Sequence, residues 1–155
     1  MTSLINNLNK NIIKNIFITG GGTGIGKEIA SVFFKNGYNV IIASRKEAVI
    51  NKAVDEIRTT KLDNNINNNI IGKTLDVRNY DEVVDFKNFL KKDNLFPDIV
   101  VNNAAGNFIS PSENLSINAW NSVIDIVLKG TINITTIFGK EMINEKKKGS
   151  FINIS

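Results

Sequence analysis

The chain has 155 residues, of which 42% are hydrophobic and 22% charged, and its formal net charge is +4. This length fits one domain that buries roughly 70% of the surface of its unfolded chain. Cysteine and histidine are both absent, which excludes disulfides, thiolate chemistry, His/Cys zinc sites and catalytic triads built from this chain.

Two further classes are disfavoured by the pattern of charge and hydropathy. The lysines are scattered apart from the cluster at residues 146–148, so we expect no nucleic-acid partner. No apolar run approaches the ~18 residues of a membrane span, so we expect no membrane-spanning segment.

Residues 1–14 form the N-terminal segment, whose end runs into the first predicted strand. They contain Lys10 and Lys14 but no acidic residue, so they are either a lead-in to that strand or a short organelle-targeting segment. We favour the lead-in, because the segment lacks arginine and runs directly into the strand.

Apolar runs and helical spacings alternate along the rest of the chain. Helices are predicted at residues 24–36, 46–60, 80–92 and 116–147, the last of them bent near residues 130–131. Strands are predicted at residues 12–18, 39–43, 70–75, 99–101 and 151–154. The first helix has apolar residues at Ile25, Ile29, Val32 and Phe33, and the second is expected to bury Val49, Ala53, Val54 and Ile57. The asparagine-rich residues 63–69 are expected to form a surface loop.

Strands that alternate with helices of this length predict βαβ units and a parallel sheet with helices on both faces. We therefore predict a single α/β domain over residues 1–155. Its fold is a Rossmann-type doubly wound sheet of about five strands, in the order 3-2-1-4-5.

A glycine-rich turn follows the first strand and opens the first helix. The residues that we assign to cofactor binding there are Gly20, Gly21, Gly22, Thr23, Gly24, Ile25 and Gly26. A turn without Cβ atoms lets the backbone approach a phosphate, and the N–H groups at the start of a helix bind the anion. A purely structural turn is the alternative, but the position between strand and helix favours a pyrophosphate site.

The second strand ends at Ser44-Arg45-Lys46. Proteins that bind NAD place an acidic residue here to hold the ribose hydroxyls. A carboxylate would repel a 2′-phosphate, whereas Arg45 can bind one with two hydrogen bonds. Ser44 and Arg45 therefore predict NADPH rather than NADH, the alternative being that Arg45 is a solvated loop residue.

The fourth strand ends in the unusual segment at residues 102–108, which begins with Asn102, Asn103 and three small residues. Such a sequence suits a backbone that lies flat against a ligand, with the amide side chains free to form hydrogen bonds. We assign Asn103 to the cofactor site.

Together, the glycine turn and this segment resemble the short-chain dehydrogenase/reductase family. The stretch from residue 103 to residue 131 is similar, more narrowly, to the 2,4-dienoyl-CoA reductases. Within it the resemblance rests on residues 107–111, 115–116, 118–120, 125–128 and 130–131.

The resemblance implies a role for individual residues. Asp76 would hold the adenine amino group, and Arg45 and Arg78 would contact the acyl-CoA. The amide of Asn107 would donate a hydrogen bond to the thioester oxygen as hydride arrives. Phe108 and Ser116 would line the acyl or pantetheine channel.

Two of these positions also have ordinary structural explanations. An Asp after a strand is most often a helix cap, although Asp81 is the better candidate for that cap. Asn107 would also suit a turn before Pro111.

The resemblance implies NADPH-dependent reduction of 2,4-dienoyl-CoA to 3-enoyl-CoA by a homotetramer in mitochondria, or alternatively in peroxisomes. It covers about the first half of the family's fold, and neither Tyr38 nor Tyr80 matches the family's catalytic tyrosine. The chain therefore looks like a fragment that ends before the catalytic tyrosine and lysine. One alternative is a reductase of ketones or 3-oxoacyl thioesters, which Val127 disfavours. The other is a truncated chain that binds nucleotide without catalysis.

Overall fold

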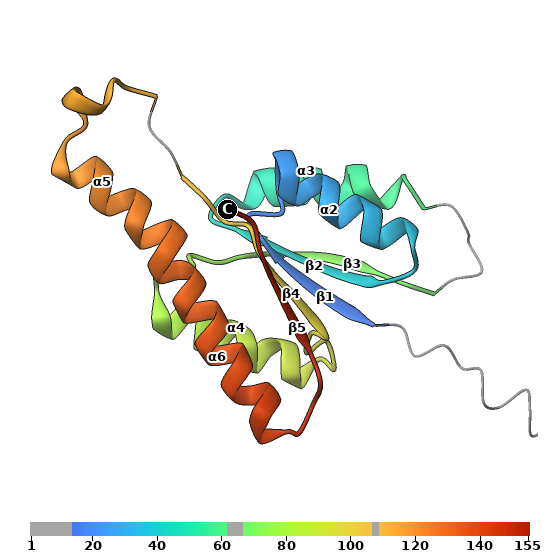
Figure 1. The fold of residues 1–155 in the computed structure, drawn as a ribbon. Helices are drawn as coiled ribbons and strands as arrows, with labels where there is room; N and C mark the ends of the chain where they lie inside the picture. The colour runs from blue at the N-terminus through green and yellow to red at the C-terminus, as the bar shows by residue number, and fades with distance from the viewer. Residues whose placement is uncertain (1–13, 62–66, 107–108) are drawn as a thin grey trace, which may run out of the picture.

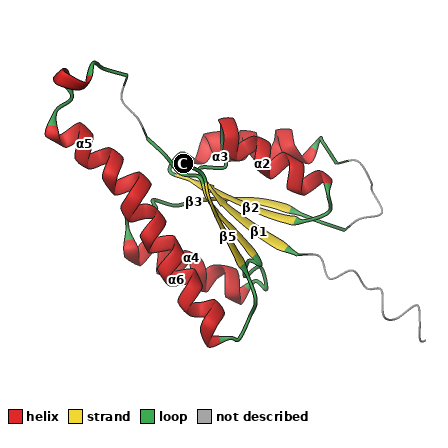
Figure 2. Cartoon of the chain, in the orientation of Figure 1, coloured by secondary structure: helices red, strands yellow, loops and turns green. Residues whose placement is uncertain are grey.

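A five-stranded parallel sheet lies between two layers of helices (Figures 1 and 2). The computed structural model describes residues 14–61, 67–106 and 109–155. The strand order is β3-β2-β1-β4-β5, which confirms the predicted doubly wound topology. The strands are β1 Asn15–Thr19, β2 Asn39–Ser44, β3 Ile70–Thr74, β4 Ile99–Asn102 and β5 Ser150–Asn153.

Each face of the sheet has its own hydrophobic core. On one face, α2 (Gly24–Lys35) and α3 (Glu47–Arg58) cover Ile16, Ile18 and Ile42. On the other, α4 (Tyr80–Lys92) and α6 (Gly130–Asn144) cover Phe17, Ile41 and Val100. The side chains of β1 and β2 alternate between these cores because successive residues of a strand point to opposite faces. Continuous apolar runs are therefore needed in these central strands.

The long helix is interrupted shortly before Gly130. It begins with α5 (Ile117–Ile124), passes through the π-helical turn η2 (Asp125–Lys129) and continues as α6 to Asn144, three residues short of the predicted end. Figure 1 shows α5 extending beyond the sheet while α6 lies against it. At Gly130 a Cβ atom would come within 2.5 Å of Val77 Cγ2, so the glycine lets α6 pack closely on the segment after β3.

The α2 helix buries a different face from the one its large apolar residues suggest. Ala30, Ser31 and Phe34 are buried, whereas Ile25 is 64% exposed and Val32 is 55% exposed. At the first turn of the helix, Gly26 lies close to Gly20 and Asn103, where a Cβ atom would have no room. In α3, Ile50 is buried together with Ala53, Val54 and Ile57, and Val49, which we predicted to be buried, is only half-buried.

The end of the asparagine-rich segment belongs to the interior, which corrects part of the surface-loop prediction. Asn68 is 7% exposed, and its Nδ2 donates to the carbonyls of Phe34 (2.7 Å) and Tyr38 (3.1 Å). Residues 62–66 and 1–13 lie outside the described part of the chain, and so does the start predicted for the first strand.

The segment Ile117–Asn144 is long and apolar enough to cross a membrane by length and composition, with a mean hydropathy of 1.3. The sequence prediction missed this. Its inner residues Ile134, Ile137, Phe138 and Met142 are buried in the core beneath the sheet, and 28% of its apolar window is buried. Its outer face exposes Ile117, Trp120, Ile124, Leu128 and Ile132.

Candidate dinucleotide site

A cavity of about 470 Å³ lies beyond the carboxyl ends of β1 to β4. The strand order reverses between β1 and β4, and open α/β sheets bind their ligands at such a switch point. The volume is within the range of small-molecule sites. The predicted cofactor residues that line this cavity are Gly20, Gly22, Thr23, Ile25, Ser44, Arg45, Asp76 and Asn103.

Close packing and backbone conformation explain why the turn contains several glycines. A Cβ atom on Gly21 would lie 2.6 Å from Ile42, and one on Gly26 would lie 2.5 Å from the Gly20 carbonyl oxygen. Gly20 and Gly24 have φ angles of +67° and +53°, which side chains with a Cβ rarely adopt. The turn therefore needs its glycines for close packing and for backbone conformation.

The segment after β4 is fastened to this turn by Thr19 and Asn103. The Thr19 hydroxyl accepts hydrogen bonds from the backbone N–H groups of Asn103 and Ala104, each 3.0 Å long. Asn103 Nδ2 donates to the carbonyls of Thr19 (3.0 Å) and Gly20 (3.3 Å). The expectation that this amide group is free to bind a ligand is therefore wrong, because its donor is used to hold the turn.

The amide of Asn102 is also used internally. Asn102 Nδ2 donates to Thr135 Oγ1 (3.0 Å) and to Asn153 Oδ1 (2.9 Å), which joins β4 to α6 and β5. Its Oδ1 is buried without a hydrogen-bond partner among the described residues. Asparagines at the ends of two neighbouring strands were the only sequence signal for this connection.

The charged residues at the end of β2 face the cavity as a group. Ser44, Arg45 and Lys46 all line it, and Arg45 and Lys46 are exposed at its edge. A hydroxyl and two cations therefore lie together at the end of β2, on the wall of the cavity.

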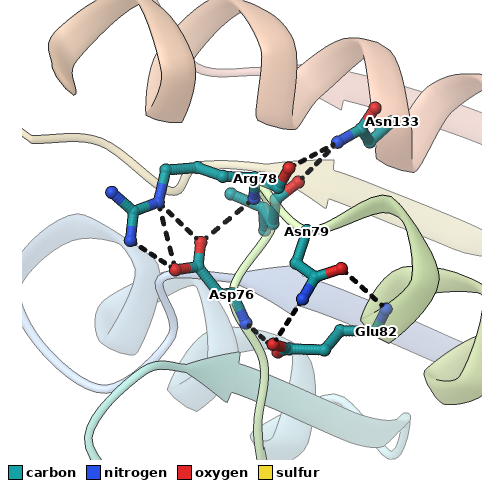
Figure 3. Close-up of polar contacts among 6 residues, drawn as sticks. Asp76, Arg78, Asn79, Glu82 and Asn133 are labelled. Atoms are coloured by element: carbon teal, nitrogen blue, oxygen red, sulfur yellow. Dashed lines mark hydrogen bonds and ion pairs between the residues drawn. The ribbon is translucent and has the colours of Figure 1, made fainter. Parts of the chain in front are cut away.

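Asp76 and Arg78 form an ion pair in the segment that follows the neighbouring strand β3 (Figure 3). Arg78 Nε lies 2.9 Å from Asp76 Oδ1 and 3.0 Å from Oδ2, and the Arg78 backbone N–H also donates to Oδ1 at 3.0 Å. The hydrogen bonds from Arg78 hold the pKa of the Asp76 carboxyl below its usual range. Asp76, which lines the cavity, is therefore ionised near neutral pH.

The cap of α4 is neither of the two acidic residues that we considered. Asn79 is the N-cap, and its Oδ1 accepts from the N–H groups of Asp81 (3.1 Å) and Glu82 (3.3 Å). Asp81 lies in the first turn instead, where its negative charge interacts favourably with the positive end of the helix dipole. Because Asn79 caps the helix, Asp76 is available for another role.

Asn133 on α6 fixes the loop that carries this ion pair. Its Nδ2 donates to the carbonyls of Val77 (2.9 Å) and Arg78 (3.3 Å), as Figure 3 shows. Sequence reasoning missed Asn133, since it is one polar residue within a helix and only the packing of α6 brings it to the loop.

The predicted substrate residues are only partly described. Asn107 and Phe108 lie outside the described residues. Ser116 is exposed and caps α5, with its hydroxyl accepting from the Ala119 N–H at 3.2 Å.

Acid is expected to destabilise the fold through its paired carboxylates. Hydrogen bonding to Lys91 lowers the pKa of Glu141, and hydrogen bonding to Arg78 lowers that of Asp76. A carboxyl whose pKa is lower in the folded state stabilises the fold above its unfolded pKa of about 4, and this contribution is lost as the pH falls through the folded value. The free energy of unfolding, measured in urea, should therefore be nearly constant from about pH 7 to 5 and fall steeply below about pH 4. Glu141→Gln should reduce this acid dependence, and an unchanged profile would contradict the prediction.

The fold, the switch-point cavity and the glycine turn define a dinucleotide-binding protein of the Rossmann type. The family model of the short chain dehydrogenases matches residues 14–155, and the chain belongs to this oxidoreductase family, whose members bind a nicotinamide cofactor.

Individual relatives show which members of this family the chain is similar to. The chain is 43% identical to a probable 2,4-dienoyl-CoA reductase 3 [(3E)-enoyl-CoA-producing] of Caenorhabditis elegans, over 92% of this chain and 45% of the relative. It is 35% identical to a peroxisomal 2,4-dienoyl-CoA reductase of Danio rerio, over 90% of this chain and 44% of the relative. The crystal structure of a short chain dehydrogenase from Bacillus anthracis superimposes with a TM-score of 0.81 at 40% identity, over 90% of this chain and 56% of that one. The chain thus spans about half the length of these relatives.

Proposed function

We propose that this chain is the cofactor-binding part of an NADPH-dependent 2,4-dienoyl-CoA reductase. The observation that carries the proposal is the cavity itself, which combines the glycine turn with Ser44, Arg45 and Asp76. In this arrangement the turn binds the pyrophosphate, Ser44 and Arg45 bind the 2′-phosphate, and Asp76 accepts a hydrogen bond from the adenine amino group. The names of the relatives from C. elegans and D. rerio support the choice of substrate.

The proposed reaction transfers hydride from NADPH to the far end of the conjugated diene. Negative charge then develops on the thioester oxygen, where a hydrogen bond donated by the amide of Asn107 would stabilise it. Arg45 would also reach a phosphate of the CoA, Arg78 would contact the acyl-CoA, and Phe108 and Ser116 would line the acyl or pantetheine channel. Protonation of the α carbon gives the 3-enoyl-CoA. Neither Tyr38 nor Tyr80 is among the described residues that line the cavity, so we assign no proton donor within this chain.

The activity is tested on the native protein, captured from its own cells with an antibody against residues 1–155. NADPH oxidation is followed with 2,4-hexadienoyl-CoA, a 3-oxoacyl-CoA and a simple ketone. The highest kcat/KM with the dienoyl-CoA is the expected result. A higher value with the 3-oxoacyl-CoA or the ketone would instead identify a reductase of ketones or 3-oxoacyl thioesters. NADPH binding without turnover would identify a chain that binds nucleotide without catalysis.

Coenzyme preference provides a second test, which depends on Arg45. A bidentate contact between arginine and a phosphate contributes about 1.5–3 kcal/mol. Arg45→Ala is therefore expected to weaken NADPH binding by about tenfold or more and to leave NADH binding within about twofold. Fluorescence titration of the 155-residue chain measures both constants. Lys52→Ala is the matched control, because Lys52 is an exposed cation on α3 whose side chain is 79% exposed. Equal weakening of both coenzymes by Arg45→Ala would contradict the 2′-phosphate assignment.

We also propose that the assembled protein is a homotetramer that uses the outer face of the long helix. Trp120, Ile124 and Leu128 are each about half exposed there (48%, 48% and 58%), and contiguous exposed apolar surface is typical of an interface. Leu128→Glu should reduce the mass of the captured protein in light scattering.

The proposed compartment is the mitochondrion, with the peroxisome as the alternative. The mitochondrial assignment rests on the resemblance alone, and the name of the D. rerio relative supports the peroxisomal alternative. Imaging of the tagged protein in its own cells distinguishes the two.

A further inference from the structure

Arg78 holds the one acidic side chain among the described residues that line the cavity. Asp76 lines the cavity, whereas Arg78 is not among the described lining residues. The Arg78 guanidinium donates to the Asp76 carboxylate through Nε and Nη2, and the Arg78 backbone N–H donates to the same carboxylate. Three donor groups of one residue thus fix a single acceptor.

The loop that carries Arg78 is itself held by α6. Asn133 binds the carbonyls of Val77 and Arg78, and Gly130 lets the helix contact Val77 closely. At the other end, Glu82 accepts a hydrogen bond from the Asp76 backbone N–H at 3.1 Å. Both the backbone and the carboxylate of Asp76 are therefore fixed, as Figure 3 shows.

Stability alone is a weak reason for this arrangement. The side chains of Arg78 and Asp76 are 36% and 23% exposed, and ion pairs this accessible contribute little to folding. Their geometry matters more for recognition, because an ionised carboxylate only accepts hydrogen bonds. Its orientation decides which part of a base it can meet. An arginine fork fixes that orientation with parallel hydrogen bonds, which the ammonium of a lysine cannot reproduce.

We propose that Arg78 is a positioning residue for base selectivity: it orients the Asp76 carboxylate to accept the exocyclic amino group of adenine and to reject a base with an oxygen at that position. The inference rests on the proposed dinucleotide function and adds to it the residue that makes the site specific for adenine. In this role Arg78 acts through Asp76. The role is separate from the contact with the acyl-CoA that we propose above for Arg78.

The test compares NADPH with its hypoxanthine analogue, in which an oxygen replaces the adenine amino group. Fluorescence titration of the 155-residue chain gives both dissociation constants, and their ratio is the readout. A hydrogen bond to a charged group corresponds to a preference for NADPH on the order of tenfold or more. Arg78→Lys should reduce the preference to about two- to threefold, mainly by weakening NADPH. Arg78→Gln keeps one donor group and gives the same readout if the lysine variant does not fold.

Two controls separate positioning from general damage. Arg58→Lys changes another exposed arginine with an aspartate neighbour, Asp55, and should leave the ratio unchanged. In an Asp76→Asn background the ratio should already be low, and Arg78→Lys should not lower it further.

The possible outcomes distinguish this inference from the function on which it rests. If Arg78→Lys weakens both ligands equally, or lowers the ratio further in the Asp76→Asn background, the positioning role is overturned while dinucleotide binding stands. If the unmodified chain binds neither ligand, the proposed function is overturned and the inference with it.

Discussion

Replacing Gly26 with alanine is expected to destabilise the chain by about 2–3 kcal/mol and to weaken NADPH binding at least tenfold. A Cβ atom at this position would lie 2.4 Å from Asn103 Nδ2 and 2.5 Å from the Gly20 carbonyl oxygen. The second neighbour is backbone and cannot rotate away, so either α2 or the glycine turn must move. Both movements change the wall of the cavity to which Gly20 and Asn103 contribute.

Gly139→Ala is the matched control, since Gly139 also lies within a helix, α6. Its Cβ would meet only Phe151, at 3.8 Å, and alanine is favoured over glycine in a helix by about 0.5–1 kcal/mol. Urea denaturation should therefore show Gly139→Ala to be more stable than the unmodified chain and Gly26→Ala to be less stable. Similar midpoints for the two variants would show that the contact at Gly26 does not constrain the turn.

The sheet could be predicted from the sequence because its signals are local. Each central strand is a continuous apolar run, and each is followed by a helix of suitable length, so the crossover rule leaves few topologies. The glycine turn could also be predicted from the sequence. Gly20 and Gly24 have left-handed φ angles that few other residues adopt, so the turn shows in the sequence as glycines.

The orientation of α2 could not be predicted in the same way. Ile25, Ile29, Val32 and Phe33 have the spacing of a buried stripe, yet Ile25 and Val32 are exposed. The face that α2 buries depends on tertiary contacts, such as those of Gly26 with Gly20 and Asn103, which come from residues before it and far after it in the chain. The spacing of apolar residues identifies the most hydrophobic face of a helix. Contacts with the rest of the fold decide which face is buried.

The partners of the site's polar side chains were also hidden from the sequence. Asn103 was assigned to the cofactor site, and it lines the cavity, but its Nδ2 donates to Thr19 and Gly20, 84 and 83 residues earlier. Asn133 and Arg78 meet only because α6 packs beneath the loop after β3. Residue type indicates that an amide needs partners, and only the fold decides whether these are protein groups or a ligand.

The second large effect is expected for Thr19→Val, which keeps the shape of the side chain but removes its hydroxyl. Thr19 is 1% exposed, and its Oγ1 accepts from two backbone N–H groups and donates to the Val101 carbonyl at 3.3 Å. Valine leaves all three groups without this partner, and each unsatisfied buried group costs about 1–3 kcal/mol. Because the N–H groups are only partly buried, we expect a total loss of about 3 kcal/mol in the free energy of unfolding.

Thr19→Ser separates the hydroxyl from the methyl group. Serine keeps the three hydrogen bonds and loses one buried methyl, which costs about 1 kcal/mol. Hydrogen exchange of the Asn103 and Ala104 amides should accelerate strongly in the valine variant and little in the serine variant. Since the same two amides fix the segment that lines the cavity, NADPH binding should weaken in the same order. Equal stability of the two variants would contradict the prediction, because the three hydrogen bonds of the hydroxyl would then contribute no more than one buried methyl group.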